Sequence, residues 1–159
     1  MMKTDIPQLV YFAPQIAGNT GAAIRLCANA GSNIHIIAPF GFDLNNTKLR
    51  RAGLDYHDLV HLQTHKNFAD FLEFTNAPTR RIWAFRTQAK IKYTDIKYEA
   101  SDYLLFGCEA TGLPESIWSD SHITDCLYIP MRNSIRSINL TNSAAIALYE
   151  TYRQLGFPK

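Results

Sequence analysis

The chain has 159 residues, 47% of them hydrophobic and 19% charged, which is typical of a globular protein and excludes a disordered or fibrous chain. No apolar run approaches the roughly 20 residues that a membrane span needs, and no apolar segment follows the first charged residues as in a secretion signal. Its three cysteines are scattered, so we expect reduced thiols and a cytoplasmic protein. The formal net charge of +2 is too mild to indicate a nucleic-acid partner by itself.

Short apolar runs alternate with stretches of helical composition along the chain. The last helix is the clearest, because apolar residues from Ala145 to Leu155 recur at three- and four-residue spacing. The alternation predicts an α/β fold with a mostly parallel sheet flanked by helices, in a single domain of residues 1–159. The predicted strands are residues 9–12, 34–37, 59–62, 82–85, 103–106 and 126–129, and the predicted helices are residues 19–30, 68–74 and 142–155.

Three polar loops follow predicted strands, which is where open α/β sheets bind ligands. Residues 18–25 place glycines before a helix whose free N–H groups could face an anion, although the segment has neither a Walker lysine nor a G-x-G-x-x-G pattern. Residues 106–114 contain two glycines that allow close backbone approach, with a plain turn as the alternative. Residues 129–143 place five hydroxyl or amide side chains ahead of the last helix, more than one helix cap needs. This excess favours a binding loop.

The same loops carry three motifs in order. An N-x-G-x-x-x-R motif matches Asn19, Gly21 and Arg25, F-G-x-E-x-x-G-L-P matches residues 106–114, and I-P-M…R-S-x-N-L-(S/T)-N-S matches residues 129–143. The chain thereby resembles the SPOUT-superfamily RNA 2'-O-methyltransferases over nearly its whole length. Among these it looks most like the small tRNA (cytidine/uridine-2'-O-)-methyltransferases of the wobble position.

The resemblance implies a fold, a cofactor and a reaction. Family members thread their C-terminal segment into a deep trefoil knot, the SPOUT fold, and form homodimers. They transfer a methyl group from S-adenosyl-L-methionine to a ribose 2'-hydroxyl of tRNA, here of cytidine or uridine at position 34. By position in the motifs, the cofactor-binding residues are expected to be Phe85, Gly107, Glu109, Ile129, Met131, Ser137 and Asn139.

The family's catalytic arginine matches Arg25 and acts across the dimer interface. A guanidinium has a pKa above about 12 and gives up its proton reluctantly, so a literal general base is disfavoured. Our hypothesis is that Arg25 holds the ribose and its phosphate and stabilises the developing alkoxide, while Asn19 orients Arg25. For RNA binding, Lys48, Arg50 and Arg51 are the favoured phosphate contacts, with a solvated basic face as the alternative.

The sequence also departs from the family pattern. Family members often carry Asn, Leu, Pro and Ser where this chain has Ala22, Phe85, Cys108 and Thr141. Two other functions stay open, namely 2'-O-methylation at another tRNA or rRNA position and a non-catalytic RNA-binding protein on the same scaffold, against which the intact motif residues argue. The sequence leaves open which tRNAs and which nucleotide are modified, whether a prior modification is needed and which group is the general base.

Three histidines at four-residue spacing raise the question of a metal site. His57, His61 and His65 lack the Glu of an H-E-x-x-H motif, and the apolar residues between them predict a strand, which would point the imidazoles in different directions. We therefore expect no metal.

Overall fold

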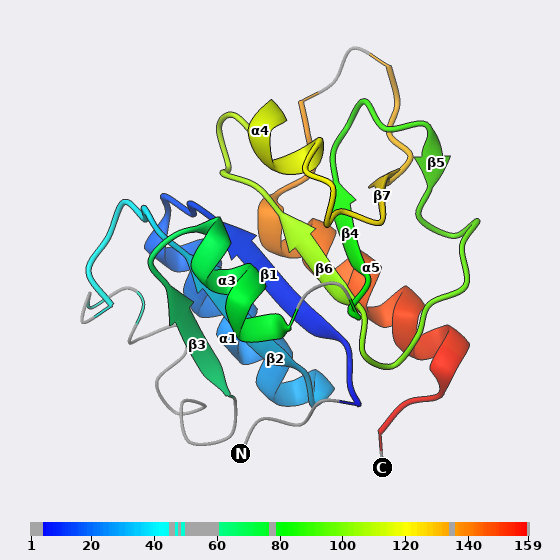
Figure 1. Ribbon diagram of the computed structural model, residues 1–159, viewed down its shortest axis with the longest axis horizontal. Coiled ribbons are helices and arrows are strands. Elements are labelled where there is room, and N and C mark those ends of the chain that lie inside the picture. The colour runs from blue at the N-terminus through cyan, green and yellow to red at the C-terminus, as the bar shows by residue number, and fades with distance from the viewer. Residues whose placement is uncertain are drawn as a thin grey trace.

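The computed structural model describes residues 5–44, 47, 49, 61–76, 79–133 and 136–158. Seven parallel strands form one sheet in the order β3-β2-β1-β6-β4-β7-β5 (Figure 1). The strands are β1 (Gln8–Phe12), β2 (Asn33–Ile37), β3 (Leu62–His65), β4 (Ile82–Phe85), β5 (Ile91–Lys92), β6 (Tyr103–Phe106) and β7 (Asp125–Tyr128).

The helices cover both faces of the sheet. They are α1 (Ala17–Ala30), α3 (Phe68–Thr75), α4 (Glu115–Trp118) and α5 (Leu140–Leu155). Helices α1 and α5 contact each other on one face, and α3 lies on the other (Figure 1). The predicted α/β fold with a parallel sheet is therefore confirmed, while the trefoil knot and the single-domain boundaries remain predictions.

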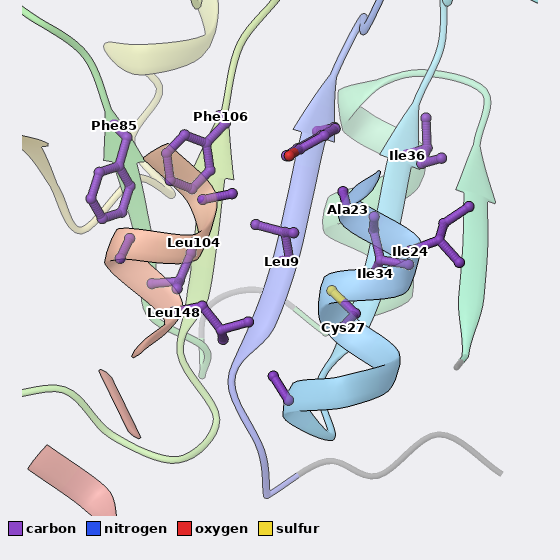
Figure 2. Close-up of a cluster of buried hydrophobic side chains, with 14 of the residues drawn as sticks. Leu9, Ala23, Ile24, Cys27, Ile34, Ile36, Phe85, Leu104, Phe106 and Leu148 are labelled. Carbon is purple, nitrogen blue, oxygen red and sulfur yellow. The ribbon is translucent and has the colours of Figure 1, made fainter. Parts of the chain in front are cut away.

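The central strands are buried on both sides, as parallel strands between two helical layers must be. In β4, Trp83 and Phe85 face the α1–α5 side, whereas Ile82 and Ala84 face the α3 side, which follows from the two-residue period of a strand. Strand β1 lies between β2 and β6, with Leu9 opposite both Ile34 and Leu104. Figure 2 shows Leu9, Ile34 and Leu104 together with helix residues of the larger core.

One predicted strand is displaced. The sequence predicts residues 59–62, but β3 runs from Leu62 to His65, and residues 59 and 60 lie outside the described part of the chain. Strand β3 is at the sheet edge and only partly buried, so it can have the polar sequence Leu-Gln-Thr-His. A search for runs of apolar residues does not detect such a strand.

No helix among the described residues is long and apolar enough to cross a membrane.

Candidate active site

A cavity of about 390 Å³ opens at the carboxyl ends of β4, β6 and β7. This is the edge at which α/β sheets place their ligand sites, and Figure 1 shows the three strands ending there, below the loops that follow them. Three segments build the wall. The lining residues are Phe85–Gln88, Phe106–Leu113, Leu127, Ile129, Met131, Ser137, Ile138, Leu140 and Ser143.

Two stacked phenyl rings form the flat apolar part of the wall. The ring centroids of Phe85 and Phe106 are 4.5 Å apart with an angle of 13° between the ring planes, and Figure 2 shows the rings side by side at the ends of β4 and β6. Both residues are nearly fully buried. A wall of this kind favours a planar, aromatic part of a ligand over a charged one.

Gly107 lets the second loop fold back on itself. A Cβ atom at this position would lie 2.2 Å from the backbone carbon of Gly112 and the backbone nitrogen of Leu113. Cys108 and Gly112 pair as an isolated bridge, and Gly112 has a φ of +68°, a conformation that favours glycine. The motif glycines are thus required for the shape of this loop, which brings backbone groups to the cavity wall.

Glu109 joins this loop to the start of α1. Its two carboxylate oxygens accept hydrogen bonds from the backbone N–H groups of Gln15 (2.7 Å) and Ile16 (3.0 Å). The N-cap residue Ile16 offers no side-chain cap, so a carboxylate from a distant loop supplies the acceptor and the negative charge that a helix N-terminus favours.

Asn19 and Asn139 extend this connection to the third loop. Asn19 Nδ2 donates to Glu109 Oε1 (3.3 Å), and Asn139 Nδ2 donates to Asn19 Oδ1 (3.0 Å). Asn139 also caps α5, because its Oδ1 accepts from the backbone N–H groups of Thr141 and Asn142. The Thr141 hydroxyl donates to the backbone oxygen of Asn19 (2.7 Å). One network, Asn139–Asn19–Glu109, therefore ties the three motif loops together.

The structure brings most of the predicted cofactor residues together. Six of them line the cavity, namely Phe85, Gly107, Glu109, Ile129, Met131 and Ser137. The seventh, Asn139, does not line the cavity, but it donates a hydrogen bond to Asn19, which in turn donates one to the lining residue Glu109.

The predicted catalytic pair is split. Asn19 belongs to the network, whereas Arg25 is exposed on α1 and does not line the cavity of its own chain. Six residues of α-helix separate them by about 9 Å along the axis. The predicted RNA contacts Lys48, Arg50 and Arg51 lie outside the described residues.

The cavity wall also contains residues that the sequence motifs do not predict. Arg86, Thr87 and Gln88 follow β4 directly and line the cavity. They belong to no motif, but their position after a buried strand is the signal that could have identified them, since loops at this edge form ligand sites.

Cys27 is a structural thiol. It is fully buried in α1, and burial raises the pKa of its thiol to about 12. A thiol of this kind stays protonated at neutral pH, and a protonated thiol is a poor nucleophile.

Known proteins resemble this chain over nearly its full length. The model of the SpoU rRNA Methylase family matches residues 7–149. Proteins of Escherichia coli (strain K12) and Yersinia pestis, both named "tRNA (cytidine(34)-2'-O)-methyltransferase", are 42% and 40% identical to it, with 94% of each chain covered. A solved structure described as "Structural insights into the 2-OH methylation of C/U34 on tRNA" superposes with a TM-score of 0.88 at 40% identity, over 96% of this chain and 98% of that one.

Proposed function

Because the chain belongs to the SpoU methylase family, we propose that it transfers a methyl group from S-adenosyl-L-methionine to the ribose 2'-hydroxyl of cytidine or uridine at tRNA position 34. The observation that carries this proposal is the cavity, whose walls consist of the loops that hold the family motifs. Relatives named for this activity at about 40% identity support the nucleotide.

The residues present fit the cofactor. The Phe85–Phe106 stack offers a flat apolar surface for an adenine ring, and the folded loop at Gly107 brings backbone donors and acceptors to the wall. Glu109 is the one carboxylate among the described lining residues, and the cofactor carries a positive sulfonium. When bound, the cofactor supplies an activated methyl group, so the protein needs no metal for this step.

The remaining task of the protein is to align the ribose and stabilise charge as the 2'-hydroxyl loses its proton. Alignment alone contributes about 7–11 kcal/mol in favourable cases. In this proposal Asn19 and Glu109 fix the start of α1, and Arg25, farther along the same helix, holds the ribose and its phosphate. A guanidinium stabilises the developing alkoxide as a fixed positive charge rather than as a base.

Arg25 does not line the cavity of its own chain, so a homodimer in which the partner subunit's Arg25 completes the site is part of the proposal. Exposed apolar side chains on the second half of α5 and just after it support a dimer. Tyr149, Leu155 and Phe157 are 45%, 41% and 57% exposed, and large apolar side chains gathered on a surface mark interaction sites. A cytoplasmic location, where tRNA is found, completes the proposal.

The test is transfer of labelled methyl from S-adenosyl-L-methionine to tRNA that lacks its own wobble modification. Digestion should return the label in 2'-O-methylcytidine or 2'-O-methyluridine mapped to position 34. Label at another nucleotide would replace the proposed position, and cofactor binding without label on any tRNA would contradict the proposed substrate. Absence of cofactor binding would contradict the proposed activity itself.

A further inference from the structure

Three arginines border the cavity without belonging to any assigned role. Arg86 lines the cavity, while Arg132 and Arg136 are exposed and adjoin the lining residues Met131 and Ser137. They come from the segments after β4 and after β7, which Figure 1 shows meeting at the same end of the sheet. We call these three residues the arginine rim.

The charge of the arginine rim is not neutralised by the described residues, none of which places a carboxylate within ion-pair distance of it. Elsewhere Arg81 pairs with Asp102 at 2.6 Å and Arg153 with Glu150 at 2.7 Å. The formal net charge of the chain is only +2, so three arginines that form no ion pair with a described residue concentrate positive charge around one cavity. An anion is the ligand that such a surface favours.

Stacking on Trp118 orients the guanidinium of Arg86 so that the N–H groups at its edge can donate hydrogen bonds. Its guanidinium carbon lies 3.8 Å from the ring centroid of Trp118, at the end of α4. Stacking on the indole covers one face of the guanidinium and fixes its plane. The N–H groups of a guanidinium point outward in this plane, in the fork geometry that matches phosphate oxygens.

We propose that the arginine rim binds the sugar–phosphate backbone of the substrate RNA beside the cavity. This inference rests on the proposed function and deepens it. A ribose that presents its 2'-hydroxyl to the cavity carries phosphates on both sides, so these phosphates must pass along the cavity edge. The cofactor has a single carboxylate, which needs fewer than three guanidinium groups as partners. An RNA backbone carries one phosphate per nucleotide, so it can contact several of these groups at once.

The experiment compares Arg86→Gln, Arg132→Gln and Arg136→Gln with a matched control, Arg80→Gln. Arg80 is, like Arg86, a partly buried arginine, but it precedes β4 and so lies at the opposite end of that strand. Binding of tRNA is measured by fluorescence anisotropy between about 50 and 200 mM salt, and cofactor affinity by calorimetry. Each rim variant should bind tRNA several-fold more weakly, with the slope of log K against log salt reduced by about 0.7–0.9 per lost phosphate contact. Arg80→Gln should bind tRNA and cofactor as the wild type does, and Arg132→Gln and Arg136→Gln should keep the wild-type cofactor affinity.

Rim variants that keep the wild-type tRNA affinity and salt slope would overturn this inference. A loss of cofactor affinity in Arg86→Gln with tRNA binding intact would also overturn it, because Arg86 would then serve the cofactor. A wild-type protein that binds cofactor but no tRNA would instead contradict the proposed substrate, on which the inference depends.

Discussion

Asn19 and Arg25 stand six residues apart on the same helix but in different surroundings. Asn19 uses both ends of its amide, accepting from Asn139 and donating to Glu109, whereas Arg25 projects from the exposed side of α1. These two hydrogen bonds hold the Asn19 amide between the second and the third motif loop. Asn19 therefore fixes the helix, and Arg25 is the residue of the pair that can meet the RNA.

Replacement of Arg25 tests this division. Arg25→Ala should lower the single-turnover methylation rate by about 10² to 10³, the usual effect of removing a group that stabilises transition-state charge. Cofactor affinity should be unchanged, because the proposed contacts of Arg25 are the ribose and its phosphate. Arg25→Lys keeps the charge but loses the planar fork, so it should recover only part of the rate. A near-normal rate in Arg25→Ala would remove Arg25 from the reaction.

Glu109 should affect stability as well as cofactor binding. Glu109→Gln removes the negative charge to which two backbone N–H groups donate just before α1, and we expect a loss of about 1–2 kcal/mol in the free energy of unfolding. Urea denaturation measures this quantity. Glu115→Gln is the matched control, since its exposed carboxylate makes no hydrogen bond to a described residue. Equal stability of the two variants would argue against a structural role for Glu109.

At the scale of elements, strands β2 and β3 share a buried pair of histidines. His35 and His65 are 0% and 3% exposed, and His35 Nδ1 lies 2.9 Å from His65 Nε2. Gln8 Nε2 donates to the backbone oxygen of Ile6, so its Oε1 accepts from His35 Nε2 at 3.2 Å. Neutral His35 must then accept at Nδ1 from His65 Nε2. Any further proton on His65 goes to Nδ1, 3.8 Å from Asp70.

This pair predicts a loss of stability in acid. Burial lowers the pKa of His35 to about 3, and burial also lowers that of His65, with Asp70 acting in the opposite direction. The unfolded chain, with a histidine pKa near 6.5, then binds more protons than the folded one between about pH 6.5 and 3, so stability falls as the pH falls through this window. For His35 alone, the free energy of unfolding should drop by about 2 kcal/mol between pH 7 and pH 5.

The measurement is urea denaturation at both pH values for the wild type, His35→Gln and His122→Gln. His122 is an exposed histidine that interacts with Asp120 in its own turn. His35→Gln should reduce the difference between the two pH values, and His122→Gln should preserve it. An equal difference in all three proteins would show that the buried pair is not the source.

The elements differ in how far the sequence determines them. Buried strands such as β4 and β6 were predicted to the residue, because both of their faces are apolar. The partly buried edge strand β3 was displaced, and the short elements β5 and α4 were missed, since a two-residue strand and a single helical turn leave no periodicity to detect. The contact between Glu109 and Gln15, 94 residues apart, depends on β6 lying beside β1, and strand order is not written in local patterns.

At the scale of the whole molecule, the proposal requires two subunits for one site. The cavity and the Asn139–Asn19–Glu109 network belong to one chain, while Arg25 lies outside that cavity. If the partner subunit supplies this arginine, two different inactive variants should complement each other. A closed twofold dimer permits this, because each mixed pair contains one site with both intact halves.

The pair to mix is Arg25→Ala, with an intact cavity, and Ser137→Trp, whose bulky side chain fills the cavity from an exposed loop position. Random exchange makes half of the dimers mixed, each with one complete site, so the mixture should recover roughly a quarter of the wild-type methylation rate. Each variant alone should stay inactive at the same total concentration, with circular dichroism confirming that both fold. If each site used the Arg25 of its own chain, every site in a mixed dimer would carry one of the two substitutions and none would be active. Absence of recovery after demonstrated subunit exchange would therefore contradict a site shared between subunits.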